Sequence, residues 1–204
     1  MTTLYITRHG ETEWNLMNRF QGWKNSPLTE KGIKQAESLH KRMSSIPLRK
    51  IYTSPTERAA VTAEIIRGDR NIDIIKDEGL REMGFGNWEG LTHEEIRALN
   101  EKEYNNLLYR PSLYVPDLGE DYATFKERII STVDKIILAH PEEAVLIVTH
   151  GISLKIMLSY FNHLNFDEIH SLPIVGQASL TQVNIDKGEF NVILTGDTSH
   201  YDFL

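Results

Sequence analysis

Residues 145–148 constrain the fold more than any other part of the sequence. They read Val-Leu-Ile-Val, so four successive positions are apolar. Because side chains alternate between the two faces of a strand, this strand is buried on both faces, as interior strands of parallel sheets are. Such a strand needs helices on both sides of its sheet. The sequence therefore predicts an α/β fold with this segment at its centre.

Strand and helix patterns alternate along the rest of the chain. Strands are predicted at residues 3–7, 49–53 and 72–76, and amphipathic helices at 28–43, 54–66, 92–100, 125–140 and 152–161. Ser54 is the predicted N-cap of the second helix, with Pro55 at its first position and Glu57 completing a capping box. Residues 179–195 indicate a hairpin closed near 186–188. Together these elements predict a three-layer α/β/α sandwich with a mostly parallel, mixed sheet.

Length and charge narrow the classes of function. The 204 residues fit a single domain spanning 1–204, and the net charge is −7. An acidic chain is a poor match for nucleic acid or for an anionic membrane surface, although it can still hold a small cationic pocket. The absence of cysteine removes disulfides, thiolate metal sites and a cysteine nucleophile. With no signal peptide and no apolar run of membrane length, we expect a cytoplasmic protein.

Ionisable side chains stand where three of the predicted strands end. Arg8-His9-Gly10 follows the first strand, and Thr149-His150-Gly151 follows the apolar one. Ser54 follows the second strand, with Arg58 in the first turn of the next helix. Ligands of open α/β sheets bind beyond the carboxyl ends of the strands, and parallel strands place those ends at one edge. The sequence thus predicts one pocket with two arginines and two histidines.

This set of side chains suits a phosphoryl group. Arginine matches phosphate oxygens bidentately, and a neutral imidazole with one nitrogen held can act as nucleophile through the other. Each residue alone has a simpler interpretation: a hydrogen-bonded structural histidine, or an arginine paired with Glu57 or Glu64. Their joint position favours the phosphate site. Gly10 and Gly151 are expected to let the backbone turn tightly and approach the ligand.

Four stretches carry a resemblance to a known family. In order along the chain they read RHGETEWN, SPTERAAVTA, LREMGFGNWEG and VTHG. Together they resemble the histidine phosphatase superfamily, which includes the cofactor-dependent phosphoglycerate mutases, over most of the chain. The resemblance implies a phosphoglycerate mutase-like fold and a phosphohistidine mechanism without a metal ion or a cofactor.

The resemblance also implies residue roles. His9 would attack phosphorus and carry the phosphoryl group, and Arg8, Arg58 and His150 would hold the non-bridging oxygens. Glu82, in LREMGFGNWEG, would protonate the leaving alkoxide and then help activate water. Further phosphate or pocket contacts would come from Asn15 and Gln21.

The chemistry of phosphoryl transfer agrees with these roles. It needs positioning, neutralised equatorial oxygens and an acid for a poor leaving group. A substrate dianion would favour the protonated form of a nearby carboxyl group by like-charge repulsion. Glu11, Asp77 and Glu89 are competing candidates for the acid, and a solvated loop carboxylate is the simpler interpretation of Glu82.

The segment at about 92–125 is predicted to cover the pocket as a lid. It is rich in apolar and aromatic residues and has three cations, Arg97, Lys102 and Arg110. An apolar lid suits a phosphate ester with an organic leaving group, although the aromatic residues could equally pack the core. Within it, Gly119-Glu120-Asp121 stands where relatives often have Gly-Glu-Ser, which leaves the role of that stretch open.

The sequence favours a phosphomonoesterase of broad specificity acting on small organic phosphate esters. It leaves open a phosphoglycerate mutase, a dedicated metabolite phosphatase of the ribazole-phosphate or sugar bisphosphate type, and a non-catalytic phosphate-binding module. Retention of His9, Arg58, Glu82 and His150 argues against the last. Monomer and homodimer are both open, and the C-terminal HYDFL fits either a tail or a packed terminus.

Overall fold

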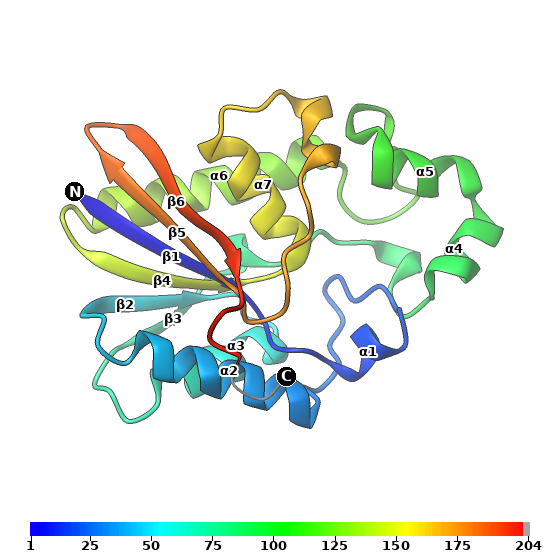
Figure 1. Cartoon of the computed structure of the whole chain (residues 1–204). Coiled ribbons are helices and arrows are strands. Elements are labelled where there is room, and N and C mark those ends of the chain that lie inside the picture. The colour runs from blue at the N-terminus through cyan, green and yellow to red at the C-terminus, as the bar shows by residue number, and fades with distance from the viewer. Residues whose placement is uncertain (202–204) are drawn as a thin grey trace.

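A six-stranded mixed sheet forms the middle of the molecule, in the order β3-β2-β4-β1-β5-β6 (Figure 1). The computed structural model describes residues 1–201, so the last three residues of HYDFL lie outside the described residues. Strands β1 to β4 are mutually parallel where they pair, and β5 and β6 are antiparallel additions at one edge. The strands are β1 Thr2–Arg8, β2 Leu48–Thr53, β3 Ile74–Lys76, β4 Ala144–Thr149, β5 Leu180–Asp186 and β6 Glu189–Asp197.

Helices cover both faces of this sheet. In Figure 1, α2 and α3 lie on one side and α6 and α7 on the other, while α4 and α5 extend beyond the strand ends. The predicted α/β/α sandwich with a mostly parallel, mixed sheet is confirmed. The helices are α1 Glu13–Leu16, α2 Glu30–Met43, α3 Glu57–Arg67, α4 His93–Leu99, α5 Glu101–Tyr109, α6 Tyr122–Ala139 and α7 Gly151–Phe161, with short 3-10 turns at η1 Glu78–Leu80, η2 Gly86–Trp88, η3 Pro111–Leu113 and η4 Phe166–Ser171.

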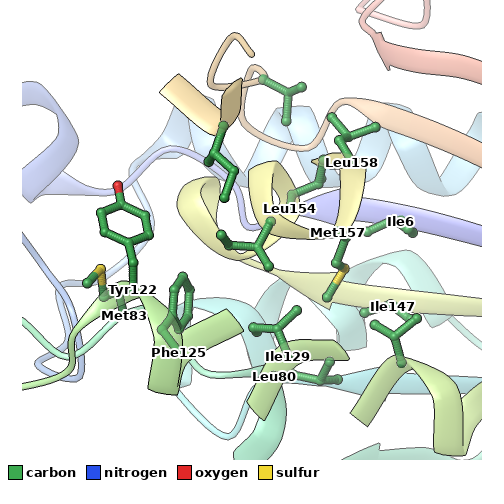
Figure 2. Packing of buried hydrophobic residues seen from close by; sticks show 14 of the residues in the cluster. Ile6, Leu80, Met83, Tyr122, Phe125, Ile129, Ile147, Leu154, Met157 and Leu158 are labelled. Atoms are coloured by element: carbon green, nitrogen blue, oxygen red, sulfur yellow. The ribbon is translucent and has the colours of Figure 1, made fainter. Parts of the chain in front are cut away.

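Strand β4 is buried on both faces, as its sequence predicts. Val145 and Ile147 pack into the cluster of α6 and α7, whereas Leu146 and Val148 pack into that of α2 and α3. All four side chains are fully buried. Figure 2 shows the first cluster, in which Ile147 lies among side chains of α6 and α7. This strand fixes both helical layers to the sheet.

Three predicted elements differ from the observed ones. Helix α3 begins at Glu57 with Thr56 as N-cap, so the predicted capping box at Ser54 is wrong. Strand β3 is only Ile74–Lys76, and a second helix, α5, follows α4 directly. The hairpin of β5 and β6 is confirmed. Among the described helices, none combines the length and apolar character needed to cross a bilayer.

Candidate active site

The ends of β1, β2 and β4 meet at one edge of the sheet. Arg8 pairs in register with Thr149. The next residue, His9, donates its backbone N–H to the Thr149 carbonyl at 2.9 Å, and the N–H of Ser54 reaches the Val148 carbonyl at 3.0 Å. This strand register brings residues from three distant parts of the chain together.

A pocket of about 170 Å³ opens at this edge. Six of the predicted site residues line it, from the first strand end, the α1 region, α3 and the loop before α4. His150, Gly10 and Gly151 do not line it. The lining residues are Arg8, His9, Asn15, Arg19, Phe20, Gln21, Gly22, Arg58, Glu82, Phe85, His93, Leu107, Leu108, Tyr122, Ile152, Lys155 and Ile174.

His9 is held as a neutral imidazole. Its side chain is only 3% exposed, and its Nδ1 lies 2.7 Å from the Gly10 carbonyl. Because a carbonyl only accepts, Nδ1 carries the proton, and Nε2 keeps its lone pair. Burial, with help from the charges of Arg58 and Arg8, holds the pKa of His9 well below its ordinary value. The ring therefore meets the requirements of a nitrogen nucleophile.

His150 lies next to His9, with ring centroids 5.3 Å apart. Its Nδ1 is 3.2 Å from the guanidinium of Arg58, which can only donate, so Nε2–H must point to Ser54 Oγ at 2.8 Å. The ring is completely buried, and this burial, with Arg58 nearby, holds its pKa well below the ordinary value. His150 thus supports Arg58 from behind the pocket. Ser54, predicted as a helix cap, serves as the partner of this ring.

Two arginines, the buried Arg58 and the half-buried Arg8, supply positive charge to the pocket. Arg58 is 1% exposed and donates to the carbonyls of Lys24 and Gly22 at 2.6 and 2.7 Å. Burial lowers the pKa of Arg58 to about 10, so the group stays charged at neutral pH. Arg8 donates from Nη1 to the Val175 carbonyl at 3.1 Å. The Nε atoms of both arginines are buried without a partner among residues 1–201, which fits a site that receives an anion.

Two amide side chains also contribute to the polar lining. The Asn15 oxygen accepts from the backbone N–H and the hydroxyl of Thr12, at 3.1 and 3.0 Å, which fixes the side chain in the short helix α1. The Oε1 atom of Gln21 is buried and has no partner within the described chain. Both amides lie on the pocket wall, where an anion could use their N–H groups.

Glu82 is the carboxylate of the pocket. Its oxygens accept from the backbone N–H groups of Met83, Ile152 and Ser153 at 3.0, 3.0 and 3.1 Å, and from the Ser153 hydroxyl at 3.1 Å. The first turn of α7 therefore fixes the direction of the side chain.

The competing carboxylates have other partners. Glu89 accepts from the backbone of Trp23, Lys24 and Phe85, while Asp77 caps η1 and Glu11 pairs with Lys31. None of them lines the pocket.

The two glycines have a packing role in this structure. A Cβ at Gly10 would stand 2.5 Å from the carbonyl oxygen of Gly32 in α2. At Gly151, a Cβ would come within 3.0 Å of Ile174 and 3.5 Å of Arg8. The expected close approach is therefore to other parts of the chain.

The opposite wall of the pocket comes from the predicted lid. Leu107, Leu108 and Tyr122 line it, whereas Tyr104 and Tyr114 are buried in the core. The predicted lid cations Arg97, Lys102 and Arg110 do not reach the pocket.

Two other cations of the lining were missed in the sequence. Arg19 pairs with Glu95 at 3.5 Å, and the Lys155 ammonium donates to the His170 carbonyl at 3.1 Å. Lys155 was detectable in principle, because it stands one helical turn after Ile152 on α7. Nothing in the local sequence marks Arg19.

The Gly119-Glu120-Asp121 stretch has a structural explanation. The side chain of Asp121 accepts from the Thr124 N–H at 2.8 Å as the N-cap of α6. Aspartate and serine are comparably good N-caps, so Asp121 can begin this helix as well as a serine would.

Comparisons with known proteins agree with this geometry. Residues 4–198 match the family described as the histidine phosphatase superfamily (branch 1). Bacillus stearothermophilus YhfR is 45% identical over 99% of this chain and 100% of its own, with a TM-score of 0.96. The phosphoserine phosphatase of Entamoeba histolytica, solved with phosphoserine, is 28% identical over 98% of this chain and 99% of its own, with a TM-score of 0.86. A phosphoglycerate mutase of Schizosaccharomyces pombe is 35% identical over 81% of this chain and 82% of the relative.

Proposed function

The chain belongs to the histidine phosphatase superfamily, a family of metal-independent enzymes, and we propose that it hydrolyses small organic phosphate esters through a phosphohistidine at His9. One observation carries the proposal. A buried, neutral imidazole, fixed through Nδ1, lines the same pocket as two arginines whose buried Nε donors are unpaired in the described chain. This is the arrangement that transfer of a phosphoryl group to nitrogen requires.

In the first half-reaction, Nε2 of His9 attacks phosphorus as the bond to the leaving oxygen breaks. Glu82, protonated in the substrate complex, gives its proton to that oxygen, because an alkoxide is a poor leaving group. Arg8 and Arg58 neutralise the charge on the non-bridging oxygens. The products of this step are the alcohol and a phosphohistidine.

In the second half-reaction, water attacks the phosphohistidine. The Glu82 carboxylate accepts a proton from this water, the P–N bond breaks, and the electron pair returns to Nε2. Inorganic phosphate leaves, and Glu82 is again protonated for the next cycle. The same two residues therefore serve both steps.

The supporting residues act on the phosphate oxygens in this proposal. Asn15 and Gln21 offer amide N–H groups from the pocket wall. His150 was expected to contact the phosphate directly, but its ring is occupied by Arg58 and Ser54. The geometry favours an indirect role, in which His150 holds the Arg58 guanidinium in place.

The segment at 92–125 chooses between water and a second substrate as acceptor. Its contribution to the pocket is chiefly apolar, from Leu107, Leu108 and Tyr122. It also supplies His93, but no lysine or arginine. This favours a phosphatase that accepts organic leaving groups. Phosphoglycerate mutase is the second candidate, because Arg19 and Lys155 also line the pocket and could hold an acidic sugar acid.

A panel of phosphate esters tests the proposal. It contains p-nitrophenyl phosphate, phosphoserine and glycerol phosphate with excess chelator present, and isomerisation of 3-phosphoglycerate is assayed in parallel. The E. histolytica relative, which binds phosphoserine and 3-phosphoglyceric acid, suggests the acidic members of this panel. Hydrolysis that withstands the chelator supports the proposal. Isomerisation faster than hydrolysis would favour the mutase, and loss of activity in chelator would contradict the mechanism.

A further inference from the structure

One arginine of α6 joins three carbonyls of the loop that carries the predicted acid. The Arg128 Nη1 donates to the carbonyls of Gly79 and Arg81, both at 3.0 Å, and Nη2 donates to the carbonyl of Glu82 at 3.2 Å. The same guanidinium donates to the Glu120 carboxylate from Nε at 2.9 Å and from Nη2 at 2.6 Å. Neither Arg128 nor Glu120 lines the pocket.

Glu120 holds the other side of this loop. Its Oε2 accepts from the Gly84 N–H at 2.9 Å, and its own N–H returns a bond to the Gly84 carbonyl at 2.9 Å. The preceding residue, Gly119, lies at φ +108, and a Cβ there would stand 2.2 Å from the Gly84 oxygen. The backbone at Gly119-Glu120 therefore packs directly against the backbone at Gly84. The predicted acid, Glu82, lies between the points held by Arg128 and by Glu120.

This ion pair is well placed to control geometry. The side chains of Arg128 and Glu120 are 22% and 11% exposed, so water competes weakly for their bonds. A bidentate arginine–carboxylate pair also fixes direction as well as distance. The Glu82 carboxylate has a separate anchor, the first turn of α7. The position of the acid is thus set jointly by α6, through the loop backbone, and by α7, through the side chain.

We propose that Arg128 and Glu120 form a positioning pair, which sets the Glu82 carboxyl group at the distance from the leaving oxygen that proton transfer needs. The inference rests on the proposed function, since it assigns the pair an effect on one step of that reaction. Proton donation is sensitive to small displacements of the donor. Phosphorylation of His9 from an ester that needs no protonation is insensitive to them.

The test compares two esters in Glu120→Gln. This substitution keeps the side-chain size but places an amide N–H₂ against the arginine or against the Gly84 N–H. We expect kcat/KM for glycerol phosphate to fall at least about tenfold, and that for p-nitrophenyl phosphate to fall less than about threefold, because only the alkoxide needs a proton. Glu127→Gln is the matched control, since Glu127 is exposed on α6 next to Arg128. It should leave both rates unchanged.

A double variant separates positioning from general structural damage. If the pair acts through Glu82, Glu120→Gln should add almost nothing to the loss already caused by Glu82→Gln. If Glu120→Gln does not fold, as judged by thermal unfolding, Arg128→Lys replaces it in the same comparison. Equal losses on both esters, no loss on either, or additive losses in the double variant would overturn the inference. An unsubstituted protein that hydrolyses neither ester would instead contradict the proposed function.

Discussion

The two walls of the pocket are built in different ways. The phosphate-facing wall consists of residues at strand ends and in the first turn of α3. Its members His9 and Arg58 are 3% and 1% exposed, and His150, which supports this wall from behind, is 0% exposed. Each is fixed by hydrogen bonds to backbone or to another member. The opposite wall comes from α5 and the start of α6, and its side chains are mainly apolar. Helix α5 also carries Tyr109, which is 60% exposed.

This difference suggests that the first wall carries out phosphoryl transfer and that the second determines which substrates bind. A nucleophile and its counter-charges must be held in place, and the register of parallel strands provides that rigidity. Apolar contacts tolerate changes of shape, so a wall of leucines can accept many leaving groups. Substitutions on the first wall should therefore change the rate for every substrate, whereas those on the second should change which substrates bind.

His9→Ala should have the largest effect. Removing the nucleophile should lower kcat for every ester of the panel at least about 10³-fold, since the phosphohistidine can then no longer form. Steady-state rates at saturating substrate measure this. His163→Asn, at an exposed histidine in a left-handed backbone conformation, is the control and should keep full activity. Near-normal turnover by His9→Ala would contradict the role of the phosphate-facing wall as the source of the nucleophile.

Glu82→Gln should distinguish substrates by their leaving groups. We expect a loss of about 10²–10⁴-fold for alkyl esters, the usual contribution of general acid catalysis, and a smaller loss for p-nitrophenyl phosphate. The measurement is kcat/KM across esters of different leaving-group pKa. An equal loss across the series would count against the acid role, and Glu94→Gln, exposed on α4, serves as control.

Leu108→Ala should test the second wall. Truncating one apolar contact should raise KM for aryl esters by about tenfold, with kcat nearly unchanged, because the lost contact is made equally before and during the reaction. Leu113→Ala is the matched control: this residue follows α5 in η3 and is 54% exposed. If Leu108→Ala lowered kcat and left KM unchanged, the wall would have a part in the chemistry.

The pKa of His9 can be measured in the unsubstituted protein. Its pKa is lowered, chiefly by burial, so the neutral, reactive ring should persist as the pH falls below about 6.5, where an ordinary histidine is half protonated. The ring C–H resonances, assigned by comparison with His9→Ala, should stay constant from about pH 8 to 6.5. A midpoint at or above 6.5 would contradict the lowered pKa that burial, with Arg58 and Arg8, gives this ring.

The fold was predictable where the apolar pattern of an element shows which of its faces are buried. Residues 145–148 are apolar on both faces, and they indeed connect the two helical layers. Helix α5 was missed because Asn100 ends α4 and caps α5 at once, so no turn residue separates them. Ser54 was misassigned because its hydroxyl is bonded to His150, 96 positions away, which no local pattern can show.

The site was predictable where it follows strand ends. Arg8, His9 and Arg58 line one pocket, as strand polarity indicates, and their roles remain predictions. It was harder to predict which side chains of the lid face the pocket. An aromatic residue on a short helix gives the same sequence pattern whether it faces the core or the pocket. Tyr114 packs into the core and Tyr122 borders both.

Trapping the covalent intermediate tests the central claim most directly. The protein is mixed with a phosphate ester, quenched within milliseconds at alkaline pH, digested, and analysed by mass spectrometry for phosphorylated peptides. We predict one acid-labile phosphoryl group on the peptide that contains His9, formed in Glu82→Gln as well and absent from His9→Ala. Labelling of a different residue, or turnover in His9→Ala with the label still present, would contradict the account.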